Sequence, residues 1–259
     1  MKIFETHAHY DDEKFNDSRE EVLKKVVDVG IERIVNVACD YDSCISSYNL
    51  AKEYDYIYYT IGVHPYEAEN FEISKLEEIY DSLDKTKLVA VGEIGLDYSH
   101  DDVNLEVKET QKKAFIQQIA FAKKHSLPII IHTRDASLDT YSILNDYTDE
   151  KDKILLHCFS PTDDLVKFTL SREKCLVAFG GNITYKRKES FFTYLNMIPM
   201  EKIVIETDSP YLPPEPKRGT INDSSNLVII AKKLAEFKGI TAEEVAKITY
   251  ENASWFYNI

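Results

Sequence analysis

The sequence predicts an α/β protein, a (β/α)8 TIM barrel that forms a single domain over residues 1–259. Two observations lead to this prediction. Eight short apolar, β-branched runs recur along the chain, and charge-rich stretches with helical spacing lie between them. Continuous apolar runs are typical of strands that are covered on both faces, as in a parallel sheet. Eight strand–helix repeats in roughly 250 residues match the usual size of such a barrel.

The eight expected strands are rich in Ile, Val and Leu. In chain order they are 3–4, 34–37, 57–62, 88–91, 129–131, 154–156, 176–179 and 203–205. A doubly wound open sheet is the alternative arrangement of the same elements. No GxGxxG motif follows the first strand, which disfavours the dinucleotide-binding version of that sheet.

Amphipathic stretches predict the helices between these strands. The clearest are 20–29, 111–125, 137–146 and 225–238. Ser18 precedes Glu21 by three residues, and Thr241 precedes Glu244 in the same way. This spacing is typical of a capping box, so we expect a helix to begin after each of the two hydroxyl residues.

Composition and charge limit the classes of function. The 259 residues are 44% hydrophobic and carry a net charge of −14. Broad electrostatic capture of nucleic acid is disfavoured, whereas a short-footprint contact depends only on the local charge. The four cysteines form no CxxC pair, so we expect reduced thiols. Residues 1–10 show no leader pattern, and no run approaches the ~18 apolar residues of a membrane span. We therefore expect a cytoplasmic protein with no membrane association and no obligatory protein partner.

Polar side chains gather where the expected strands end. They are His7, His9, His64, Glu93, His132, His157 and Asp208. The C-terminal ends of barrel strands meet at one mouth, so these scattered positions are expected to converge in space. Side chains two apart on an extended backbone point to the same face, which predicts that both histidines of the HxH pair turn inward.

Imidazole nitrogens and carboxylates together are ligands that suit Zn²⁺, Mn²⁺ and similar ions. Each residue alone has a structural alternative, because a strand-end histidine is often packed and a carboxylate at this position often caps the next helix. Five of the seven histidines lie at the expected mouth, while His100 and His125 fall in a loop and at a helix end. This joint pattern favours a metal site.

The chain resembles the TatD-like hydrolases, a branch of the amidohydrolase superfamily, nearly from end to end. GEIGLDY at 92–98 and ETDSPYL at 206–212 are the most specific matches. The others are THAH at 6–9, GVHP at 62–65, HTRDA at 132–136, HCFS at 157–160, FGGNITYK at 179–186 and PEPKRG at 214–219.

The resemblance implies a metal-dependent hydrolase acting on ester bonds, with two divalent ions (Mg²⁺, Mn²⁺ or Zn²⁺). It implies that His7, His9, Glu93 and Asp208 hold one ion, and that Glu93, His132 and His157 hold the second. The expected reaction is hydrolysis of DNA or another phosphodiester by a metal-activated water, as in a 3′–5′ exonuclease-like deoxyribonuclease.

We assign catalytic roles to Asp208, Glu93 and His64, with Asp208 accepting the proton of the attacking water and His64 a candidate for protonating the leaving group. The expected substrate-binding residues are His64, Arg134, Tyr185, Lys186 and Arg218, because Arg suits bidentate phosphate contacts. Phe159, Tyr185 and Tyr211 are candidates for stacking on a base. The structural alternative is that the basic run at 186–188 is a solvated loop and that these aromatics pack the rim.

Two departures from the family pattern fall beside the expected site. Glu5 stands where the family usually has Asp, and Tyr66 replaces the second His of a GxHPH stretch. A metal-dependent amide, lactone or ester hydrolase of the same superfamily is the alternative function, and a non-catalytic metal-binding protein is another. Amide and lactone enzymes of this architecture often use a carboxylated Lys at the end of strand four, where this chain has Glu93. That difference favours phosphodiester chemistry.

Overall fold

A computed structural model describes residues 1–259 and contains the predicted barrel. Its eight strands form one parallel sheet in the order β1 to β8. The strands are β1 (Ile3–Ala8), β2 (Ile31–Asn36), β3 (Ile57–Ile61), β4 (Leu88–Asp97), β5 (Ile129–Arg134), β6 (Ile154–Leu156), β7 (Cys175–Phe179) and β8 (Ile203–Ile205). All eight expected strands are therefore confirmed, and the TIM barrel prediction with them.

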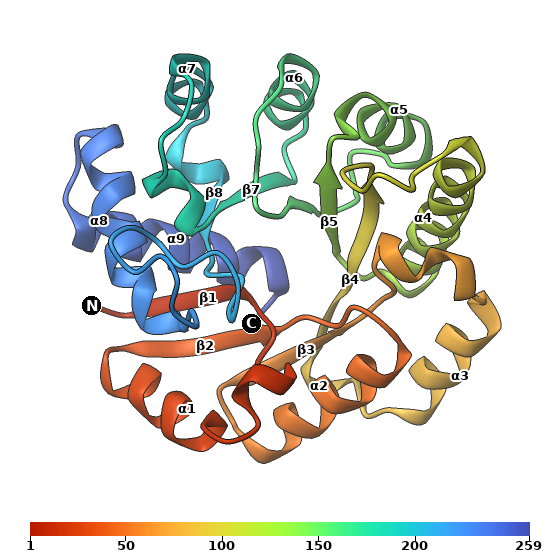
Figure 1. The fold of residues 1–259 in the computed structure, drawn as a ribbon, viewed down its shortest axis with the longest axis horizontal. Coiled ribbons are helices and arrows are strands. Elements are labelled where there is room, and N and C mark those ends of the chain that lie inside the picture. The colour runs from red at the N-terminus through yellow and green to blue at the C-terminus, as the bar shows by residue number, and fades with distance from the viewer.

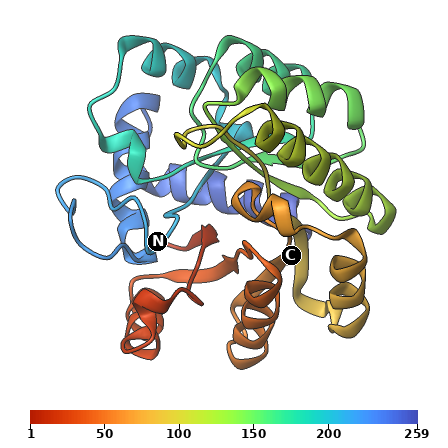
Figure 2. The same cartoon turned by 45° about the vertical axis from the view of Figure 1, so that its right-hand side comes forward.

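Backbone hydrogen bonds between β1 and the segment after β8 close the barrel. Ala8 and Ser209 form a parallel bridge. The backbone N–H of His9 donates to the carbonyl of Ser209 over 2.7 Å, and that of Asp208 donates to the carbonyl of His7 over 2.9 Å. Figure 1 shows the strands in a ring with the helices on its outside, and the turned view of Figure 2 shows the same arrangement.

Nine α-helices cover the barrel. They are α1 (Arg19–Asp28), α2 (Tyr41–Glu53), α3 (Ile73–Ser82), α4 (Leu105–His125), α5 (Ser137–Tyr147), α6 (Asp163–Ser171), α7 (Glu189–Met197), α8 (Leu227–Lys238) and α9 (Ala242–Tyr257). Short 3-10 helices include η2 (Pro65–Asn70), η4 (Gly181–Thr184) and η6 (Ser224–Asn226). None of the helices combines the length and apolar character needed to cross a lipid bilayer.

One of the two predicted capping boxes is confirmed. Thr241 and Glu244 exchange both bonds of the box at the start of α9. Helix α1 also begins directly after Ser18, but the Ser18 side chain makes no capping hydrogen bond, so that part of the prediction is wrong. The backbone of Ser18 has φ −136° and ψ 0°, outside the extended region from which an N-cap side chain normally reaches the first turn.

The apolar strand residues divide into two layers by their parity. Ile129 and Ile131 of β5 face outward and pack with the helices, whereas Ile130 between them faces the barrel interior. The same alternation places Leu155 of β6 and Val204 of β8 inside the barrel. This is the period of two that an extended backbone imposes.

Helix α9 covers the N-terminal end of the barrel. Its residues Ala253, Phe256 and Tyr257 pack in the interior layer with Phe4, near the start of β1. The Tyr257 hydroxyl donates to the carbonyl of Thr6 over 2.9 Å. Figure 1 shows this helix beside β1 and β8. The opposite end, where the strands finish, is therefore the open one.

Candidate metal centre

The inward-facing parity of the strands continues from the apolar layer into the polar site. His132 lies two residues after Ile130, His157 two residues after Leu155, and Glu206 two residues after Val204. Each therefore points into the barrel at its C-terminal end. Several site residues lie inside strands rather than after them, because β1 and β4 are longer than expected and include His7 and Glu93.

Four ligand-type atoms converge beside β1. Nε2 of His7 lies 3.2 Å from Nε2 of His9 and 3.3 Å from Oε2 of Glu93. Oδ1 of Asp208 lies 3.3 Å from Nε2 of His9 and 3.9 Å from Nε2 of His7. Ligand atoms that surround an ion tetrahedrally at 2.0–2.2 Å lie roughly 3.3–3.6 Å apart. His7, His9 and Glu93 lie close enough together to hold an ion, and Oδ1 of Asp208 approaches this group from the side of His9.

The other carboxylate oxygen of Glu93 faces a second group. Oε1 lies 2.6 Å from Nδ1 of His132, 3.3 Å from Nε2 of His157 and 3.8 Å from Nε2 of His64. Glu93 is almost fully buried between the two groups. Its two oxygens thus face separate sets of imidazoles, an arrangement that fits a carboxylate shared by two cations.

Two of the imidazoles have a hydrogen-bond acceptor behind the ring. Nδ1 of His9 lies 2.8 Å from the carbonyl of Val37, and Nε2 of His132 lies 2.8 Å from Oδ2 of Asp97. Nδ1 of His157 lies 3.0 Å from Oε1 of Glu206, which is an ion-pair distance without the geometry of a hydrogen bond. An acceptor on this side holds the ring proton and leaves the other nitrogen free to bind a metal.

Asp97 and Glu206 were not among the predicted site residues. Both are fully buried and both belong to motifs quoted above, GEIGLDY and ETDSPYL. Glu206 could have been predicted from the sequence, because it lies two residues after the inward-facing Val204 and therefore points inward as well. Glu206 lies close enough to His7 and His157 for these three residues to hold an ion together, whereas Asp97 contacts His132 from behind the ring.

The carboxylates at the centre stay ionised at neutral pH. Burial raises the pKa of Glu93, but the imidazoles of His157 and His7 outweigh it and hold that pKa well below its ordinary value. Burial likewise raises the pKa of Asp208, while its hydrogen bond with His9 and the nearby His157 lower it overall. Burial lowers the pKa of His157, but Glu206 and Glu93 raise it overall to about 10, so this ring carries a proton at neutral pH that a cation would displace. Ionised carboxylates and deprotonated imidazoles are the donor set of a divalent cation. The residues present therefore fit a metal.

His64 presents a donor rather than a lone pair. Its Nδ1 accepts a hydrogen bond from the backbone N–H of Tyr66 over 3.2 Å. Burial and the neighbouring His132 lower the pKa of His64 to about 3, so the ring is neutral and its proton lies on Nε2. That N–H faces the centre, where it can donate to an oxygen of a bound molecule.

The helix-capping alternative for the two carboxylates is wrong. Glu93 lies within β4. Asp208 follows β8 in a left-handed conformation with φ 60°, and the next helix, η6, has Asp223 at its N-cap. Glu5 holds the Asp208 segment from below, since its carboxylate accepts hydrogen bonds from the backbone N–H and the hydroxyl of Thr207.

A pocket of about 870 Å³ opens above the centre. Of the predicted substrate-binding residues, His64, Arg134 and Tyr185 line it, whereas Lys186 and Arg218 do not. Arg187, the neighbour of Lys186, lines the pocket instead. The Arg218 guanidinium lies over the Tyr185 ring at 4.3 Å, so one face of that ring is already covered.

The rim aromatics differ in their access to this pocket. Phe159 is fully buried, so the prediction that it stacks on a base is wrong; its backbone N–H donates to the carbonyl of Ala178, which draws the segment inward. Tyr211 is 42% exposed and lines the pocket. Tyr66, 47% exposed, also lines it, and its hydroxyl donates to Asp97 over 2.9 Å.

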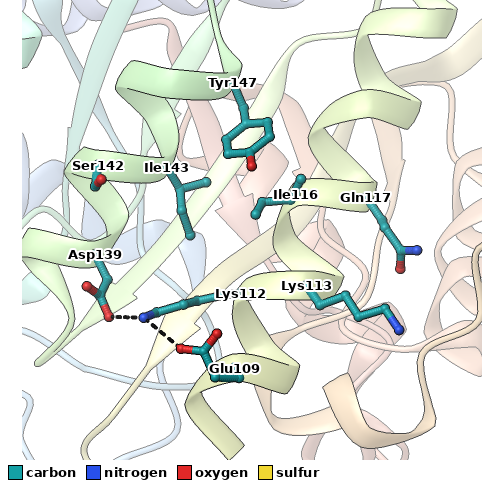
Figure 3. A pocket seen from close by; sticks show the side chains of 9 residues that line it. All are labelled: Glu109, Lys112, Lys113, Ile116, Gln117, Asp139, Ser142, Ile143 and Tyr147. Atoms are coloured by element: carbon teal, nitrogen blue, oxygen red, sulfur yellow. Dashed lines mark hydrogen bonds and ion pairs between the residues drawn. The ribbon is translucent and has the colours of Figure 1, made fainter. Parts of the chain in front are cut away.

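A second hollow, of about 410 Å³, lies between α4 and α5 (Figure 3). Lys112 extends across it and pairs with Glu109 at 3.1 Å and Asp139 at 2.9 Å. The charged groups of this hollow are therefore paired with one another. Ile116 and Ile143 supply apolar surface to the same hollow. It contains none of the converging histidines and offers no comparable chemistry.

Comparison with known proteins identifies the family. The family model described as TatD related DNase matches residues 4–258. The chain belongs to this family. It is 37% identical over 257 residues to a Bacillus subtilis protein named uncharacterized metal-dependent hydrolase YabD, with 99% of each chain covered. It is also 26% identical over 261 residues to the Escherichia coli protein named 3′-5′ ssDNA/RNA exonuclease TatD, again with 99% of each covered.

Solved structures of TatD proteins share the fold. The crystal structure of YjjV, a TatD homologue from Escherichia coli, superposes with a TM-score of 0.89 at 26% identity, covering 99% of this chain and 98% of the other. A TatD family hydrolase from Entamoeba histolytica gives a TM-score of 0.86 at 22% identity, with 99% and 98% covered. The chain is thus a TatD-family metal-dependent hydrolase on a (β/α)8 barrel.

Proposed function

We propose that this chain is a two-metal phosphodiesterase that removes nucleotides from the 3′ end of single-stranded DNA. The observation that carries the proposal is the position of Glu93, whose two oxygens face separate groups of ligand atoms. The name of the Escherichia coli relative, a 3′-5′ exonuclease of single-stranded DNA and RNA, supports the choice of substrate and polarity.

Each group of atoms would hold one ion. His7, His9, Glu93 and Asp208 form the first ligand set, and Glu93, His132 and His157 form the second. When bound, Mg²⁺, Mn²⁺ or Zn²⁺ polarises a phosphoryl oxygen and lowers the pKa of water towards neutrality. The two ions add four positive charges beside two carboxylates, so the centre attracts phosphate although the protein as a whole is acidic.

Asp208 is the carboxylate suited to take the proton of the attacking water. It lines the pocket, and its side chain is 15% exposed against 4% for Glu93. Its lowered pKa keeps it ionised and therefore able to accept a proton. Of its two oxygens, Oδ1 faces His9, which leaves Oδ2 for the water.

His64 and Arg134 would position the phosphate. The Nε2–H of neutral His64 can donate to an oxygen on the leaving side, which is a hydrogen-bonding role and not proton transfer from an imidazolium. Arg134 ends β5 at the pocket wall and forms no ion pair, so its guanidinium remains available to a phosphate. Tyr185 lines the pocket, whereas Lys186 and Arg218 would act outside it, on the strand that leaves the pocket.

The test is hydrolysis of labelled oligonucleotides by metal-stripped protein to which Mg²⁺, Mn²⁺ or Zn²⁺ is returned. Single-stranded DNA with a 5′ label should shorten one nucleotide at a time, faster than the duplex. Glu93→Gln and Asp208→Asn should abolish the reaction, and His125→Ala, outside the pocket, should preserve it. Parallel assays use RNA, an amide and a lactone. Turnover of the amide or lactone alone would overturn the proposal.

A further inference from the structure

One wall of the pocket contains buried polar atoms that the protein itself leaves without partners. This β6–β7 wall consists of Thr162, Asn182 and Arg187. Asn182 is only 3% exposed. Its Nδ2 donates to Sγ of Cys158 over 3.3 Å, while its Oδ1 has no hydrogen-bond partner. A buried amide oxygen without a donor is costly, so a ligand that donates to it is expected.

Thr162 presents a second buried atom of this kind. Its Oγ1 has no hydrogen-bond partner, and the residue, at the N-cap of α6, lines the same pocket. A hydroxyl both donates and accepts. The wall therefore offers one fixed acceptor and one adaptable group.

Arg187 supplies the charge of the wall. Its Nε donates to the backbone carbonyl of Asn182 over 3.2 Å, and its guanidinium lies 5.2 Å from the centroid of the Phe191 ring. These two contacts fix the orientation of the side chain. No carboxylate forms an ion pair with it, so its terminal N–H groups remain available to an anion.

The acidic and basic side chains are unevenly placed around the pocket. Asp40 and Glu67 line the side that follows β2 and β3, while Arg134 and Arg187, the only arginines or lysines that line the pocket, follow β5 and β7. Asp135, next to Arg134, also lines the pocket and offsets the charge of that arginine. A phosphate is therefore attracted most strongly beside Arg187, at the β6–β7 wall.

We propose that the β6–β7 wall binds the 3′-terminal nucleotide of the substrate and recognises its free 3′-hydroxyl. Arg187 binds the phosphate of that nucleotide, Asn182 Oδ1 accepts a hydrogen bond from the 3′-hydroxyl, and Thr162 donates one to it. This inference rests on the proposed function and adds the feature that makes the enzyme specific for strand ends.

The chemistry of the acceptor explains the selectivity. A 3′-hydroxyl has a proton to give to Asn182, whereas a 3′-phosphodiester or a dianionic 3′-phosphate has none. Two acceptors would then face each other in a buried place, which is unfavourable. A site built to bind a hydroxyl discriminates strongly against an analogue that lacks its proton.

The test compares three chromogenic phosphodiesters in the metal-loaded protein. The p-nitrophenyl ester of thymidine 5′-phosphate carries the free 3′-hydroxyl, its 3′-phosphorylated form lacks that proton, and bis(p-nitrophenyl) phosphate has no sugar. The wild type should hydrolyse the hydroxyl form about 100-fold more efficiently than the 3′-phosphate. Asn182→Leu and Thr162→Val should each lower the ratio of kcat/KM for the hydroxyl form to kcat/KM for bis(p-nitrophenyl) phosphate by about 10-fold or more.

The sugar-free ester also reports on folding, because a misfolded variant loses activity on every substrate. Arg187→Ala should weaken all three reactions through KM. Lys167→Ala, at an exposed position of α6, is the matched charge control and should change none of them. Equal turnover of the hydroxyl and phosphate forms, or an unchanged Asn182→Leu, refutes the nucleotide subsite alone. A wild type that is inactive on bis(p-nitrophenyl) phosphate as well refutes the proposed function and the subsite together.

Discussion

Asp97 and His132 are joined by a hydrogen bond of 2.8 Å between Oδ2 and Nε2. The bond holds the ring proton on Nε2 and directs Nδ1 to within 2.6 Å of Glu93. Asp97 is itself fixed, because Tyr66 donates to the same oxygen and Ser99 donates twice to the other. An imidazole so oriented is prepared to bind a cation through Nδ1.

Replacing Asp97 by Asn should weaken metal binding without unfolding the protein. The amide is a poorer acceptor than the carboxylate, and it can turn its own N–H toward the ring and disturb the tautomer. Losses from such outer partners are typically 10- to 100-fold in affinity. Titration calorimetry of Mn²⁺ into metal-stripped protein measures the effect directly.

Asp139→Asn is the matched control for this change. Asp139 lies on α5, where it pairs with Lys112 and accepts from the Tyr98 hydroxyl, outside the pocket over the centre. Its loss should leave the Mn²⁺ affinity unchanged. If Asp97→Asn and Asp139→Asn bound Mn²⁺ equally well, Asp97 would have no role in orienting His132.

Thr60 connects two backbone segments beneath Glu93 through hydrogen bonds of its hydroxyl group. Its hydroxyl accepts from the N–H of Ala38 over 3.0 Å and donates to the carbonyl of Gly92. Thr60→Val leaves both buried groups without a partner, which should cost roughly 2–5 kcal/mol in the free energy of unfolding. Thr60→Ser keeps the hydroxyl and should cost about 1 kcal/mol for the lost methyl group. Urea unfolding in EDTA compares them, and similar losses would show that the hydroxyl is unimportant.

The convergence of the histidines could be predicted because it depends on a rule that every barrel strand follows. His132 and His157 each stand two residues after an inward-facing apolar residue, and parallel strands in a barrel end at one mouth. The same rule finds Glu206. Asp97 escaped prediction because β4 continues six residues beyond the expected end at Val91, and the apolar pattern contains no sign of this extension.

Loop residues could not be placed in this way because no periodicity governs them. The basic run at 186–188 was correctly expected after the seventh strand, yet the residue that enters the pocket is Arg187 and not Lys186. Arg187 donates a hydrogen bond to the Asn182 backbone and lies against Phe191, and these contacts hold its side chain at the pocket. Phe159 is buried by a similar contact between loop and strand, with Ala178. Such contacts depend on the folded neighbour and leave no trace in the local sequence.

Gly95, in the GEIGLDY motif, has a backbone that excludes other residues. Its φ is 146°, and an added Cβ would lie 2.0 Å from the carbonyl oxygen of His132. Gly95→Ala must therefore displace β5 at a proposed metal ligand, with an expected loss of more than about 3 kcal/mol in unfolding free energy. Gly239 also has a positive φ, 67°, but nothing lies within 4 Å of its Cβ position. Gly239→Ala should cost only about 1 kcal/mol, and equal losses in thermal unfolding would contradict the steric argument.

Cys44 and Cys175 should resist alkylation in the folded protein at pH 8. Both are buried, and burial raises the pKa of each thiol to about 12. Because the pKa is raised, the unreactive neutral thiol dominates below that pH. Peptide mapping after iodoacetamide treatment should find these two unmodified, whereas all four cysteines should react in guanidinium chloride. Rapid labelling of either in the native protein would show that its surroundings open readily.

The division of Glu93 between two groups predicts how the number of bound metals changes with mutation. Native mass spectrometry of the wild type should find two divalent ions. His132→Ala leaves the second set with only Glu93 and His157, while His7, His9, Glu93 and Asp208 stay intact. One ion should therefore remain. Glu93→Gln removes the charge that both sets share, so both affinities should fall.

Thermal unfolding adds an independent measure of the same binding. At a metal concentration 100 times the Kd, each site should stabilise the fold by about 2.7 kcal/mol, which is roughly 5–10 °C in Tm for a chain of this size. The wild type should gain the contribution of two sites and His132→Ala that of one. His125→Ala, whose ring lies beside Glu77 on the outside of the barrel, should gain as much as the wild type. If His132→Ala still bound two ions, the second ligand set would be wrongly assigned.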